Sequence, residues 1–565
     1  MKFLSRSFLV LLALYGMVFA LGTAFLARQH VSLWWALLFS VGWIGFQYAI
    51  SPWLIEHILS IDWNENELPA VNRAFVDQLC LERRLHKPRM GVIHSGTPNA
   101  FSFGRVRRDA RVVVTKGLLD VLTPDEANAV IAHEIGHIEH YDFAVMAVAA
   151  LAPLILYQIY VWTDRVNNTR AIAWGAYVCY WIGQFLVLTL NRTREYYADH
   201  FSAEATRAPG DLSSALIKIA YGMVRADGEY QQAMKDRSTT DKKRRKREHQ
   251  LGGAISLLGI ANLKSSQSLA LAVADPAQAA AVMRWDIVNP WARFYQLNST
   301  HPLTALRVRA LNLESESMHQ KVHYPLPASK TTDRKLQFLL FPFELALWLA
   351  PWACGFFLLF GERLNSVLAL LHLHLPRFAD TWIVDGWLMT LLGATWMLRI
   401  AYRYRGEFTS SRIASLIEDT EVSQMRPRAV ELRGEIVGNG VPGAFWSPDF
   451  VMRDESGMIF LLYRSSIPFA RLFFALTSAD RFIGEQVVLE GWYRRGLRPY
   501  VEISKLSADV VQTDAGPGLI SVLGTSSSNA ERRPERLVQR SYSRWIQSAL
   551  AAAATAAGII WLKRG

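Results

Sequence analysis

The stretch AVIAHEIGHIEHYD, residues 129–142, contains the pattern His-Glu-x-x-His at His133, Glu134 and His137. It follows TPDE (123–126), in which threonine can cap a helix, proline fits the first turn and glutamate can complete a capping box. We therefore predict that a helix begins here and runs through the motif. Because residues four apart lie on one helical face, His133 and His137 can offer two imidazoles to one metal ion.

The predicted helix is strongly apolar around the motif. Burying two histidines and a glutamate among aliphatic residues costs free energy unless these polar groups have partners, and a bound metal ion would supply one. The alternative is a helix that carries the pattern by chance. Glu134 is rotated slightly from the two histidines, so we assign it to removing a proton from the attacking water rather than to binding the metal.

A third ligand is needed, because a catalytic zinc ion usually has three protein ligands and one open position. His140 is one candidate, but a straight helix separates it from His133 by about 10.5 Å of rise, too far for one small ion. The other candidate is Glu195 in RTREYYADH (192–200), which we prefer. Asp199, four residues later, is then suited to orient a ligand histidine by a hydrogen bond.

The composition indicates a membrane protein. The chain has 565 residues, of which 51% are hydrophobic, yet it carries a net charge of +12. This combination is typical of a membrane protein with basic soluble parts. The three cysteines are far apart, so neither a disulfide framework nor a cysteine zinc site is implied. A basic cytoplasmic side explains the charge more simply than nucleic-acid binding, so we expect no nucleic-acid partner.

Several apolar segments are candidate membrane spans, since a span needs about 20 residues. We interpret the first as an uncleaved anchor rather than a signal peptide, because its apolar run is long and another follows at once. Glu344 and Asp385 lie near the ends of two later segments, where we expect them to reach the membrane interface. The candidates are Ser7–Ala27, Val31–Ile55, Phe143–Thr163, Ala171–Asn191, about 337–360, 381–398 and Ile546–Leu562.

The basic residues predict the orientation. With a cytoplasmic N-terminus, the translocated segments (28–30, 164–170, about 361–380 and 563–565) hold only seven of the 61 lysines and arginines. The KKRRKR segment (242–247) then stays inside, as the positive-inside rule expects. His133 and Glu195 must share one side, so the two apolar segments between them form a hairpin. We expect a multi-pass integral protein of a bacterial inner membrane with its site facing the cytoplasm.

Four ordered motifs resemble the HtpX-type and CaaX-prenyl-protease-type integral membrane zinc metallopeptidases over about residues 60–315. They are TPNAFSFG (97–104), VVVTKGLLDVLTPDEANAVIAHEIGHIEHYD (112–142), REYYADHFSAEAT (194–206) and NSTHPLTALRVRAL (298–311). The resemblance implies a zincin-like α+β domain that acts on protein or peptide substrates. It implies one Zn²⁺ per chain, held by His133, His137 and Glu195, with Glu134 as general base and Asp199 supporting a ligand.

Further residues of these motifs have weaker expectations attached. Asn99, Ala100 and Phe101 look like the family's edge strand, whose backbone would pair with an extended substrate peptide. The alternative is a sheet edge without function. His140 and His200 are expected to be solvated or structural, and we leave both out of the site.

The last motif contains two candidate site residues. Arg307 is expected to pair with Asp199 or with another carboxylate of the site. His301 is a candidate donor to the oxyanion that develops on the substrate carbonyl. A purely structural role in capping a helix is an equally good interpretation of either residue, so the sequence leaves both alternatives open.

The resemblance ends at about residue 330. Alternating apolar and polar residues predict a small β-barrel across about 427–508, and GWYRRGLRPYVEI (491–503) resembles OB-like barrels. Such barrels can bind nucleic acid, but between membrane anchors we favour a module that presents substrates or binds a partner. We divide the chain into a transmembrane pair (1–56), a zinc metallopeptidase domain (57–335, including the membrane hairpin 143–191), a second transmembrane pair (336–400), an OB-like barrel (401–510), a flexible linker (511–543) and a C-terminal transmembrane anchor (544–565).

The expected fold is therefore a mainly α membrane protein with an α+β protease domain and a small C-terminal β-barrel. We favour a zinc endopeptidase of membrane-protein quality control. The alternatives are a prenylated-peptide protease of the CaaX type and a non-catalytic membrane scaffold that acts through the barrel. A degenerate protease should have lost a ligand or the base, and the motif lacks neither, which favours an enzyme. The sequence identifies neither the physiological substrate nor the oligomeric state.

Overall fold

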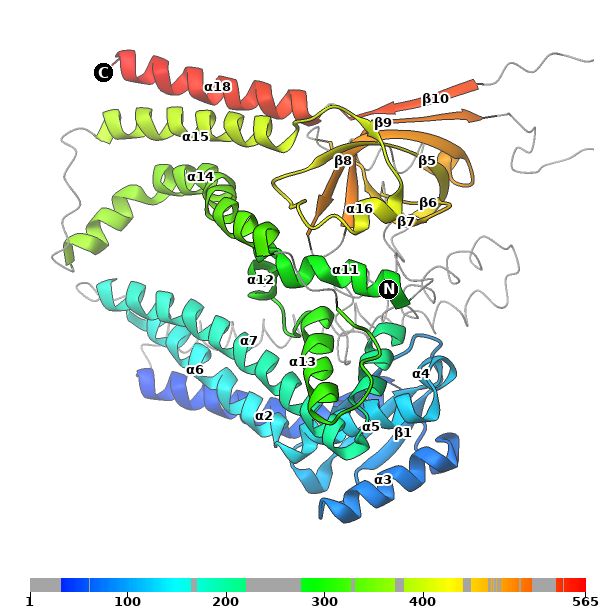
Figure 1. Ribbon diagram of the computed structural model, residues 1–565. Helices are drawn as coiled ribbons and strands as arrows, with labels where there is room; N and C mark the ends of the chain where they lie inside the picture. The colour runs from blue at the N-terminus through cyan, green and yellow to red at the C-terminus, as the bar shows by residue number, and fades with distance from the viewer. Residues whose placement is uncertain are drawn as a thin grey trace, which may run out of the picture.

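The computed structural model describes residues 32–59, 61–163, 170–219, 276–326, 331–370, 381–439, 449–465, 479–496, 499–510, 535–541 and 543–564, together with residues 469, 471 and 474. The predicted first span, Ser7–Ala27, the KKRRKR segment and most of the predicted linker lie outside this description. Long helices extend to one side of the molecule, and a small α+β body and a β-barrel lie at their other end (Figure 1).

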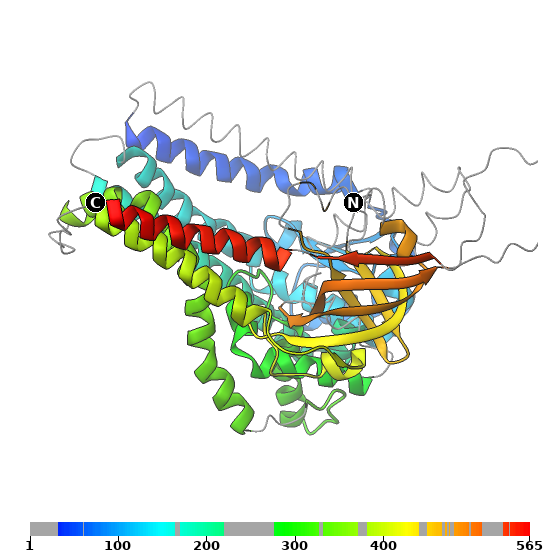
Figure 2. The same cartoon turned by 90° about the horizontal axis from the view of Figure 1, so that it is seen from above.

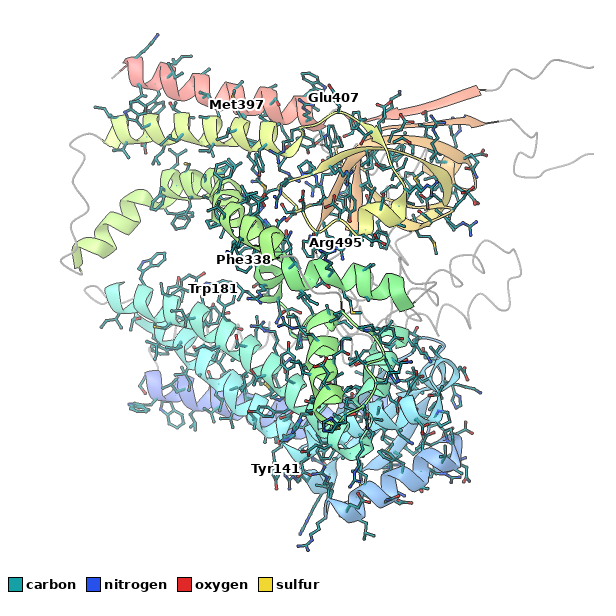
Figure 3. All side chains as sticks on the ribbon, in the orientation of Figure 1. Tyr141, Trp181, Phe338, Met397, Glu407 and Arg495 are labelled. Carbon is teal, nitrogen blue, oxygen red and sulfur yellow. The ribbon has the colours of Figure 1, made fainter. Side chains whose placement is uncertain are left out.

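Six of the described helices are long and apolar enough to cross a membrane. They correspond to the remaining six predicted spans, including those at 337–360 and 381–398. Large apolar side chains such as Trp181 are exposed along them, as expected for surfaces that face lipid (Figure 3). The helices are α2 (Leu33–Leu59), α6 (Asp142–Thr163), α7 (Arg170–Thr206), α14 (Thr331–Leu370), α15 (Thr381–Arg403) and α18 (Ser543–Arg564).

The last two of these helices pack closely together (Figures 1 and 2). A Cβ atom at Gly393 of α15 would lie 2.2 Å from Thr555 Oγ1 and 2.5 Å from the Ala551 carbonyl oxygen of α18. The absence of a side chain at Gly393 therefore permits this crossing, as small residues commonly do between membrane helices. The C-terminal anchor is in this way joined to the second transmembrane pair.

Helix α7 contains both the predicted fourth span and the RTREYYADH segment. It is 37 residues long and runs from the predicted fourth span through the RTREYYADH segment without a break. Helices α6 and α7 lie side by side as the predicted hairpin (Figure 1). The second helix therefore carries Glu195 rigidly out of the membrane bundle to the level of the His-Glu-x-x-His motif.

The α+β body is built around the motif helix. Strands β1 (Arg89–Ile93), β2 (Ala100–Phe103) and β3 (Arg111–Thr115) pair in the order β1-β3-β2, with β1 parallel and β2 antiparallel to β3. Strand β3 is the central strand, and its three consecutive valines and Thr115 are buried. Around the sheet lie η1 (Glu65–Glu67), α3 (Ala70–Glu82), η2 (Arg107–Asp109), α4 (Lys116–Val121) and α5 (Pro124–Glu139).

Helix α5 begins as predicted. Thr123 caps it, Glu126 completes the capping box, and residues 126–138 are buried. Burial acts to raise the pKa of Glu126, but hydrogen bonds from Lys218, Ser214 and the Thr123 amide lower it below its usual value. A Cβ atom at Gly136 would lie 3.2 Å from the Ala198 Cα atom, so glycine allows α5 and α7 to approach closely.

Three shorter helices connect the body to the C-terminal part. They are α11 (Pro276–Val288), α12 (Pro290–Gln296) and α13 (Thr304–Ser317). Helix α13 packs against α7 and α11. The Asn289 side chain caps α12 by accepting a hydrogen bond from the Trp291 amide, 3.1 Å away. These helices bring the His-Pro…Arg motif from a distant part of the sequence to the end of α7.

The small barrel predicted at about 427–508 is confirmed. Five described strands close it in the order β5-β6-β7-β9-β8-β5, with β7 and β9 parallel and the other neighbours antiparallel. The two-residue strand β4 (Thr409–Ser410) and the short helices α16 (Ile413–Ile417) and η3 (Ala479–Phe482) adjoin it. The barrel strands are β5 (Arg428–Asn439), β6 (Phe450–Asp454), β7 (Gly457–Leu462), β8 (Gln486–Arg495) and β9 (Pro499–Val510).

The prediction of a flexible linker at 511–543 is wrong for six residues, 535–540, which form a strand. Strand β10 (Glu535–Arg540) pairs antiparallel with β9, from Val510 to Lys505. Its sequence, ERLVQR, is too short and charged to resemble an independent strand. An edge strand tolerates charged side chains and draws its stability from the neighbouring strand, which composition does not reveal.

The expectation that Glu344 reaches the membrane interface is also wrong. Its side chain is fully buried. Its carboxylate accepts hydrogen bonds from Trp291 Nε1 at 2.6 Å, Ser423 Oγ at 2.9 Å and Tyr402 OH at 3.0 Å, and Arg426 Nε lies 3.2 Å away. Glu344 therefore joins two membrane helices, α12 and the segment that leads into the barrel.

The barrel is joined directly to the protease part. Arg495 of β8 is fully buried and donates hydrogen bonds to the Ile417 carbonyl and, at 2.8 Å, to the Val282 carbonyl of α11. Val282 itself belongs to the hydrophobic core of the barrel. Figure 3 shows Arg495 at this junction. The barrel and α11 therefore share one packed interior.

A buried carboxylate stabilises the barrel next to the membrane helices. Glu502 of β9 lies 3.0 Å from Arg494 Nε and accepts a hydrogen bond of 2.6 Å from Tyr404 OH. Burial acts to raise the pKa of Glu502, but the guanidinium groups of Arg494, Arg464 and Arg403 and the Tyr404 hydroxyl lower it to about 2. The ionised carboxylate is thus part of the folded structure at neutral pH.

We predict that Glu502→Gln lowers the unfolding free energy at pH 7 by about 3 kcal/mol, because the pKa of Glu502 is lower in the folded state. This contribution is complete above the unfolded pKa of about 4.5 and is lost as the pH falls toward 2. Thermal unfolding of the full chain between pH 7 and pH 3 measures it. Glu435→Gln, at a partly exposed ion pair with Arg453, is the control. Equal stability of the Glu502 and Glu435 variants at pH 7 would contradict the prediction.

Candidate metal centre

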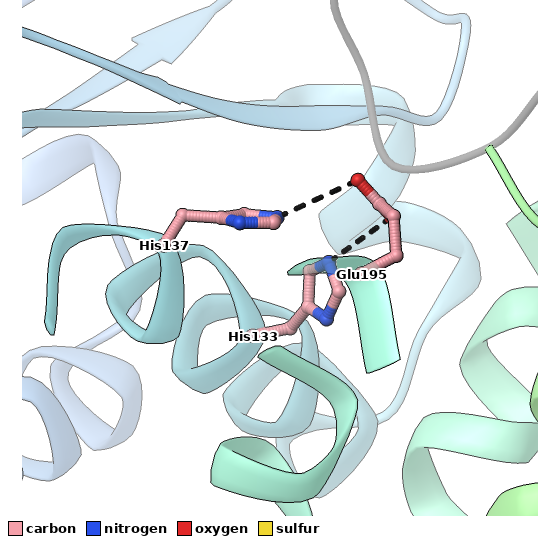
Figure 4. Close-up of side chains that lie close together, drawn as sticks. All are labelled: His133, His137 and Glu195. Atoms are coloured by element: carbon pink, nitrogen blue, oxygen red, sulfur yellow. Dashed lines mark ion pairs between the residues drawn. The ribbon is translucent and has the colours of Figure 1, made fainter. Parts of the chain in front are cut away.

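Helices α5 and α7 bring three predicted ligands together. His133 and His137 project from α5 toward Glu195 of α7 (Figure 4). Glu195 Oε2 lies 3.8 Å from His133 Nε2, and Glu195 Oε1 lies 3.8 Å from His137 Nε2. All three residues are buried, and one ligand atom of each lies within 4.8 Å of the others. Residues far apart in the sequence thus form one compact group.

These residues fit a metal ion. His133 Nε2 and Glu195 Oε2 are buried and have no hydrogen-bond partner among the residues that the structure describes. Two zinc ligands at bond lengths of 2.0–2.1 Å and tetrahedral angles lie about 3.3 Å apart, so the two Glu195–histidine separations of 3.8 Å would need to shorten by about 0.5 Å around the ion. Two imidazoles and one carboxylate also form a donor set used by catalytic zinc sites. A cation shared by the three residues would satisfy the unpartnered atoms.

Asp199 and Arg307 support one side of the group. His133 Nδ1 lies 3.0 Å from Asp199 Oδ1. Arg307 of α13 donates two hydrogen bonds to the Asp199 carboxylate, at 2.6 and 2.9 Å, and its Nη1 lies 3.4 Å from Glu195 Oε2. Burial acts to lower the pKa of Arg307, but the carboxylates of Asp199 and Glu195 raise it above its usual value. Arg307 is therefore charged and holds both carboxylates in place.

Sequence reasoning missed the support on the other side. His137 Nδ1 donates a hydrogen bond of 2.6 Å to Asp142, and Arg194 Nε lies 2.9 Å from the other oxygen of that carboxylate. Burial acts to lower the pKa of His137, but Asp142, Glu195 and Glu134 raise it above its usual value. The sequence did contain a clue to this contact, because Asp142 is the last residue of AVIAHEIGHIEHYD and immediately precedes the apolar span Phe143–Thr163. A positive φ of 55° at Tyr141 turns the chain there.

We predict that Asp142→Asn lowers metal affinity about 10–100-fold, because the partner that orients His137 is weakened while the ligand remains. Titration of the metal-free protein against a chelator of known affinity measures this change. Asp120→Asn, at an exposed residue of α4, is the control. An unchanged affinity of the Asp142 variant would show that His137 is oriented without this hydrogen bond.

The candidate base lies beside the predicted substrate strand. Glu134 is buried, and its Oε2 accepts a hydrogen bond of 2.8 Å from Ser102 Oγ of β2. Within the described parts of the chain, β2 pairs only with β3 and forms an edge of the sheet. Asn99, Ala100 and Phe101 are buried, and Asn99 Oδ1 accepts a hydrogen bond from the Ala100 amide. All three residues are therefore enclosed in the described structure.

Of the other three histidines in the motifs, one lies next to the ligand group and two lie outside it. His301 Nδ1 lies 3.2 Å from Glu195 Oε1, next to the ligand group. It does not cap α13, whose N-cap is Leu303 without a side-chain hydrogen bond, and Arg307 lies inside that helix. His140 contacts the Gly136 carbonyl and His200 contacts Glu314, both outside the ligand group.

Comparisons with known proteins match this geometry to a family. The profile of peptidase family M48 matches residues 63–315. A protease HtpX homolog of Methanothermobacter thermautotrophicus is 39% identical over 219 residues, which cover 38% of this chain and 84% of that relative. The chain belongs to peptidase family M48. Protease HtpX homolog 2 of Methanosarcina acetivorans is 33% identical over 232 residues, covering 38% of this chain and 77% of its own.

A solved structure overlaps more loosely. The crystal structure of S. mikatae Ste24p matches with a TM-score of 0.34 and 16% identity, over 54% of this chain and 64% of its own. This overlap is too weak to bear on the fold. The M48 match and the HtpX homologues make the chain a metalloprotease, a hydrolase that acts on proteins or peptides. With six membrane-capable helices among its described residues, it is a multi-pass integral membrane protein. The resemblance predicted from the motifs is confirmed, and neither the CaaX-type protease nor the scaffold is favoured.

Proposed function

We propose that the protein is a zinc-dependent endopeptidase whose single zinc ion is held by His133, His137 and Glu195. The observation that carries this proposal is the buried group of two imidazoles and one carboxylate, in which His133 Nε2 and Glu195 Oε2 face one another and have no hydrogen-bond partner among the described residues. Bound zinc supplies the Lewis acidity that polarises the scissile carbonyl and activates water. Glu134, adjacent to the first ligand and next to β2, is the group that handles the proton.

The other steps belong to residues of this chain. Glu134 removes a proton from the attacking water and delivers it to the leaving amine, while Ser102 orients its carboxylate by the hydrogen bond that it donates. Asp199 orients His133, and Arg307 fixes Asp199 and Glu195. His301 is proposed to donate to the oxyanion that develops on the substrate carbonyl, because it lies next to the ligand group.

Substrate peptides are proposed to bind in extended form along β2. The strand has a free edge in the described part of the sheet, and Ser102 of this strand contacts the base. The Asn99 amide and carbonyl already bond to Thr115, and the Ala100 amide bonds to Asn99 Oδ1. A peptide lying along Asn99, Ala100 and Phe101 would therefore pair with those backbone groups of the segment that face away from β3, which would place a peptide bond close to Glu134. Recognition through the backbone depends little on substrate sequence, which suits an enzyme of membrane-protein quality control.

We propose that the site faces the cytoplasm of a bacterial cell, with the spans in the inner membrane. The long helices extend to one side, and the α+β body and the barrel lie together at the other end (Figure 1). On the topology predicted from the sequence, nearly all basic residues belong to the side that carries these two parts. The positive-inside rule therefore favours the cytoplasm. The partners of the enzyme are then the bilayer and protein substrates that include membrane proteins.

The barrel is proposed to be OB-like. Numbered along the chain, its five strands close in the order 1-2-3-5-4-1 with strands 3 and 5 parallel, an arrangement compatible with a five-stranded Greek-key barrel. We propose that it presents substrates or binds a partner, because it packs on α11 of the protease part. The domain division proposed from the sequence is retained, with β10 added to the barrel.

Purified full-length protein with zinc, incubated with casein and separately with a farnesylated peptide, tests the proposed function. The proposal expects casein fragments, chelator-sensitive cleavage and no requirement for the farnesyl group. Cleavage of the farnesylated peptide alone would instead favour a prenylated-peptide protease.

A further inference from the structure

A cluster of four arginines lies where the membrane helices α15 and α18 meet the barrel. It consists of Arg399 and Arg403 of α15 and Arg464 and Arg494 of the barrel region, and we call it the arginine cluster. Arg403 and Arg494 both contact Glu502, Arg399 interacts electrostatically with Arg403 and Arg464, and Arg464 interacts with Glu502. The candidate spans end at Arg403 and begin again at Ser543. The cluster therefore lies at the level where the hydrophobic helices give way to the soluble barrel.

The arginine cluster is only partly satisfied by protein groups. Arg494 donates hydrogen bonds to Glu502 at 3.0 Å, to the Arg403 carbonyl at 2.5 Å and to the Gln424 carbonyl at 3.2 Å. Arg403 is buried, yet its Nε and Nη2 atoms have no hydrogen-bond partner among the described residues. Its Nη2 lies 3.7 Å from Glu502 Oε2. Arg403 therefore retains buried donors for a further acceptor.

Positive charge exceeds negative charge around the arginine cluster. Glu502 is the carboxylate that Arg403 and Arg494 share. Asp449 also attracts the Arg464 charge, but it lies 3.5 Å from Arg471 and is shared with that arginine. Glu344 lies 3.2 Å from Arg426. A buried charge without a counter-charge costs free energy, so we expect an anion to bind to the arginine cluster.

The position of the arginine cluster indicates which anion. Arg399 contacts the Trp348 carbonyl of α14 at 3.4 Å, so its guanidinium lies between two membrane helices. At the start of α18, Trp545 is 69% exposed and its ring lies 5.6 Å from the Arg544 guanidinium. Exposed tryptophans and arginines at the end of a span are typical of the headgroup region of a bilayer. Phosphate oxygens of lipid headgroups are concentrated at this level.

We propose that the arginine cluster binds the phosphate group of an anionic phospholipid. Guanidinium groups match phosphate oxygens in geometry and charge, and basic groups between membrane helices on the cytoplasmic side suit such headgroups. Arg399 and Arg464 are partly exposed, whereas Arg403 and Arg494 are buried. A bound phosphate would join membrane helix α15 to the barrel. This lipid site is separate from the metal centre and does not depend on peptide hydrolysis.

Lipid binding to purified full-length protein tests this inference. The double variant Arg399→Gln/Arg464→Gln removes the two partly exposed charges, and Arg433→Gln on the barrel surface, at a side chain 75% exposed, is the matched control. Phosphatidylglycerol, phosphatidylcholine and inorganic phosphate are added separately at constant ionic strength. Bound lipid is counted by native mass spectrometry, and thermal unfolding reports stabilisation.

We expect phosphatidylglycerol to bind and raise the unfolding temperature of the wild type and the control, with little effect from phosphatidylcholine. The affinity of phosphatidylglycerol for the double variant should be lower than for the wild type by on the order of 10–100-fold. Equal binding to the double variant, or stabilisation by inorganic phosphate but not by phosphatidylglycerol, would overturn the lipid assignment. If the double variant does not fold, Arg399→Gln alone is compared with Arg399→Lys. Equal lipid affinity of these two would likewise overturn it, since only lysine keeps the charge.

Discussion

Replacing Glu134 with glutamine is expected to reduce peptide hydrolysis about a thousandfold while the metal stays bound. The amide has nearly the same shape but cannot accept the proton of the attacking water. Glu134 lies beside the ligand group without belonging to it, so the three ligands remain intact. The hydrogen bond from Ser102 can still be accepted by the amide oxygen, which preserves the local structure.

Two measurements on the purified Glu134 variant check this result. Hydrolysis of a fluorogenic peptide gives kcat/KM, and elemental analysis gives the metal content. Asp125→Asn, an exposed acid-to-amide change in the first turn of the same helix, should leave both at the wild-type level. Full proteolysis by the Glu134 variant would refute the role assigned to this residue.

The variant Glu195→Gln is expected to lose both the metal and the activity. A neutral amide is a poor zinc ligand, so His133 and His137 would be left to hold the ion alone. If the binding free energy is shared among the ligands, losing one lowers metal affinity about 10²–10³-fold. Activity measured without excess zinc should then fall to background.

The matched control for this change lies on the same helix. Glu204 of α7 pairs with Arg83 and His200 at the surface, so Glu204→Gln should keep one metal per chain and wild-type hydrolysis. Dialysis against a weak chelator, followed by elemental analysis, compares the two variants. Wild-type zinc content in the Glu195 variant would mean that another residue supplies the third ligand.

Local patterns in the sequence predicted much of this arrangement. Helix α5 follows from a capping box and an apolar run, both of which depend on neighbouring residues. His133 and His137 are four residues apart, so helical geometry alone places them on one face. Glu195 could be proposed because a third ligand is needed and RTREYYADH offers a carboxylate where the fourth apolar segment ends, and the membrane hairpin follows from that choice. Each of these inferences needs only short-range geometry or the thickness of a bilayer.

The groups that the sequence did not predict depend on distant contacts. Glu344 is bound by Trp291, Tyr402, Ser423 and Arg426, which come from three separate segments of the chain. No periodicity or spacing relates these residues, so the carboxylate resembled an ordinary charge near the end of a span. Asp142 was overlooked for a similar reason, since its contact with His137 depends on the turn at Tyr141 rather than on helical spacing.

The central claim is that one zinc ion is shared by His133, His137 and Glu195. Crystallographic data collected just above and just below the zinc absorption edge test it most directly. We predict one anomalous peak within about 2.0–2.2 Å of His133 Nε2, His137 Nε2 and a Glu195 oxygen. No peak there in zinc-loaded, active protein, or a peak bound to other residues, would contradict the account.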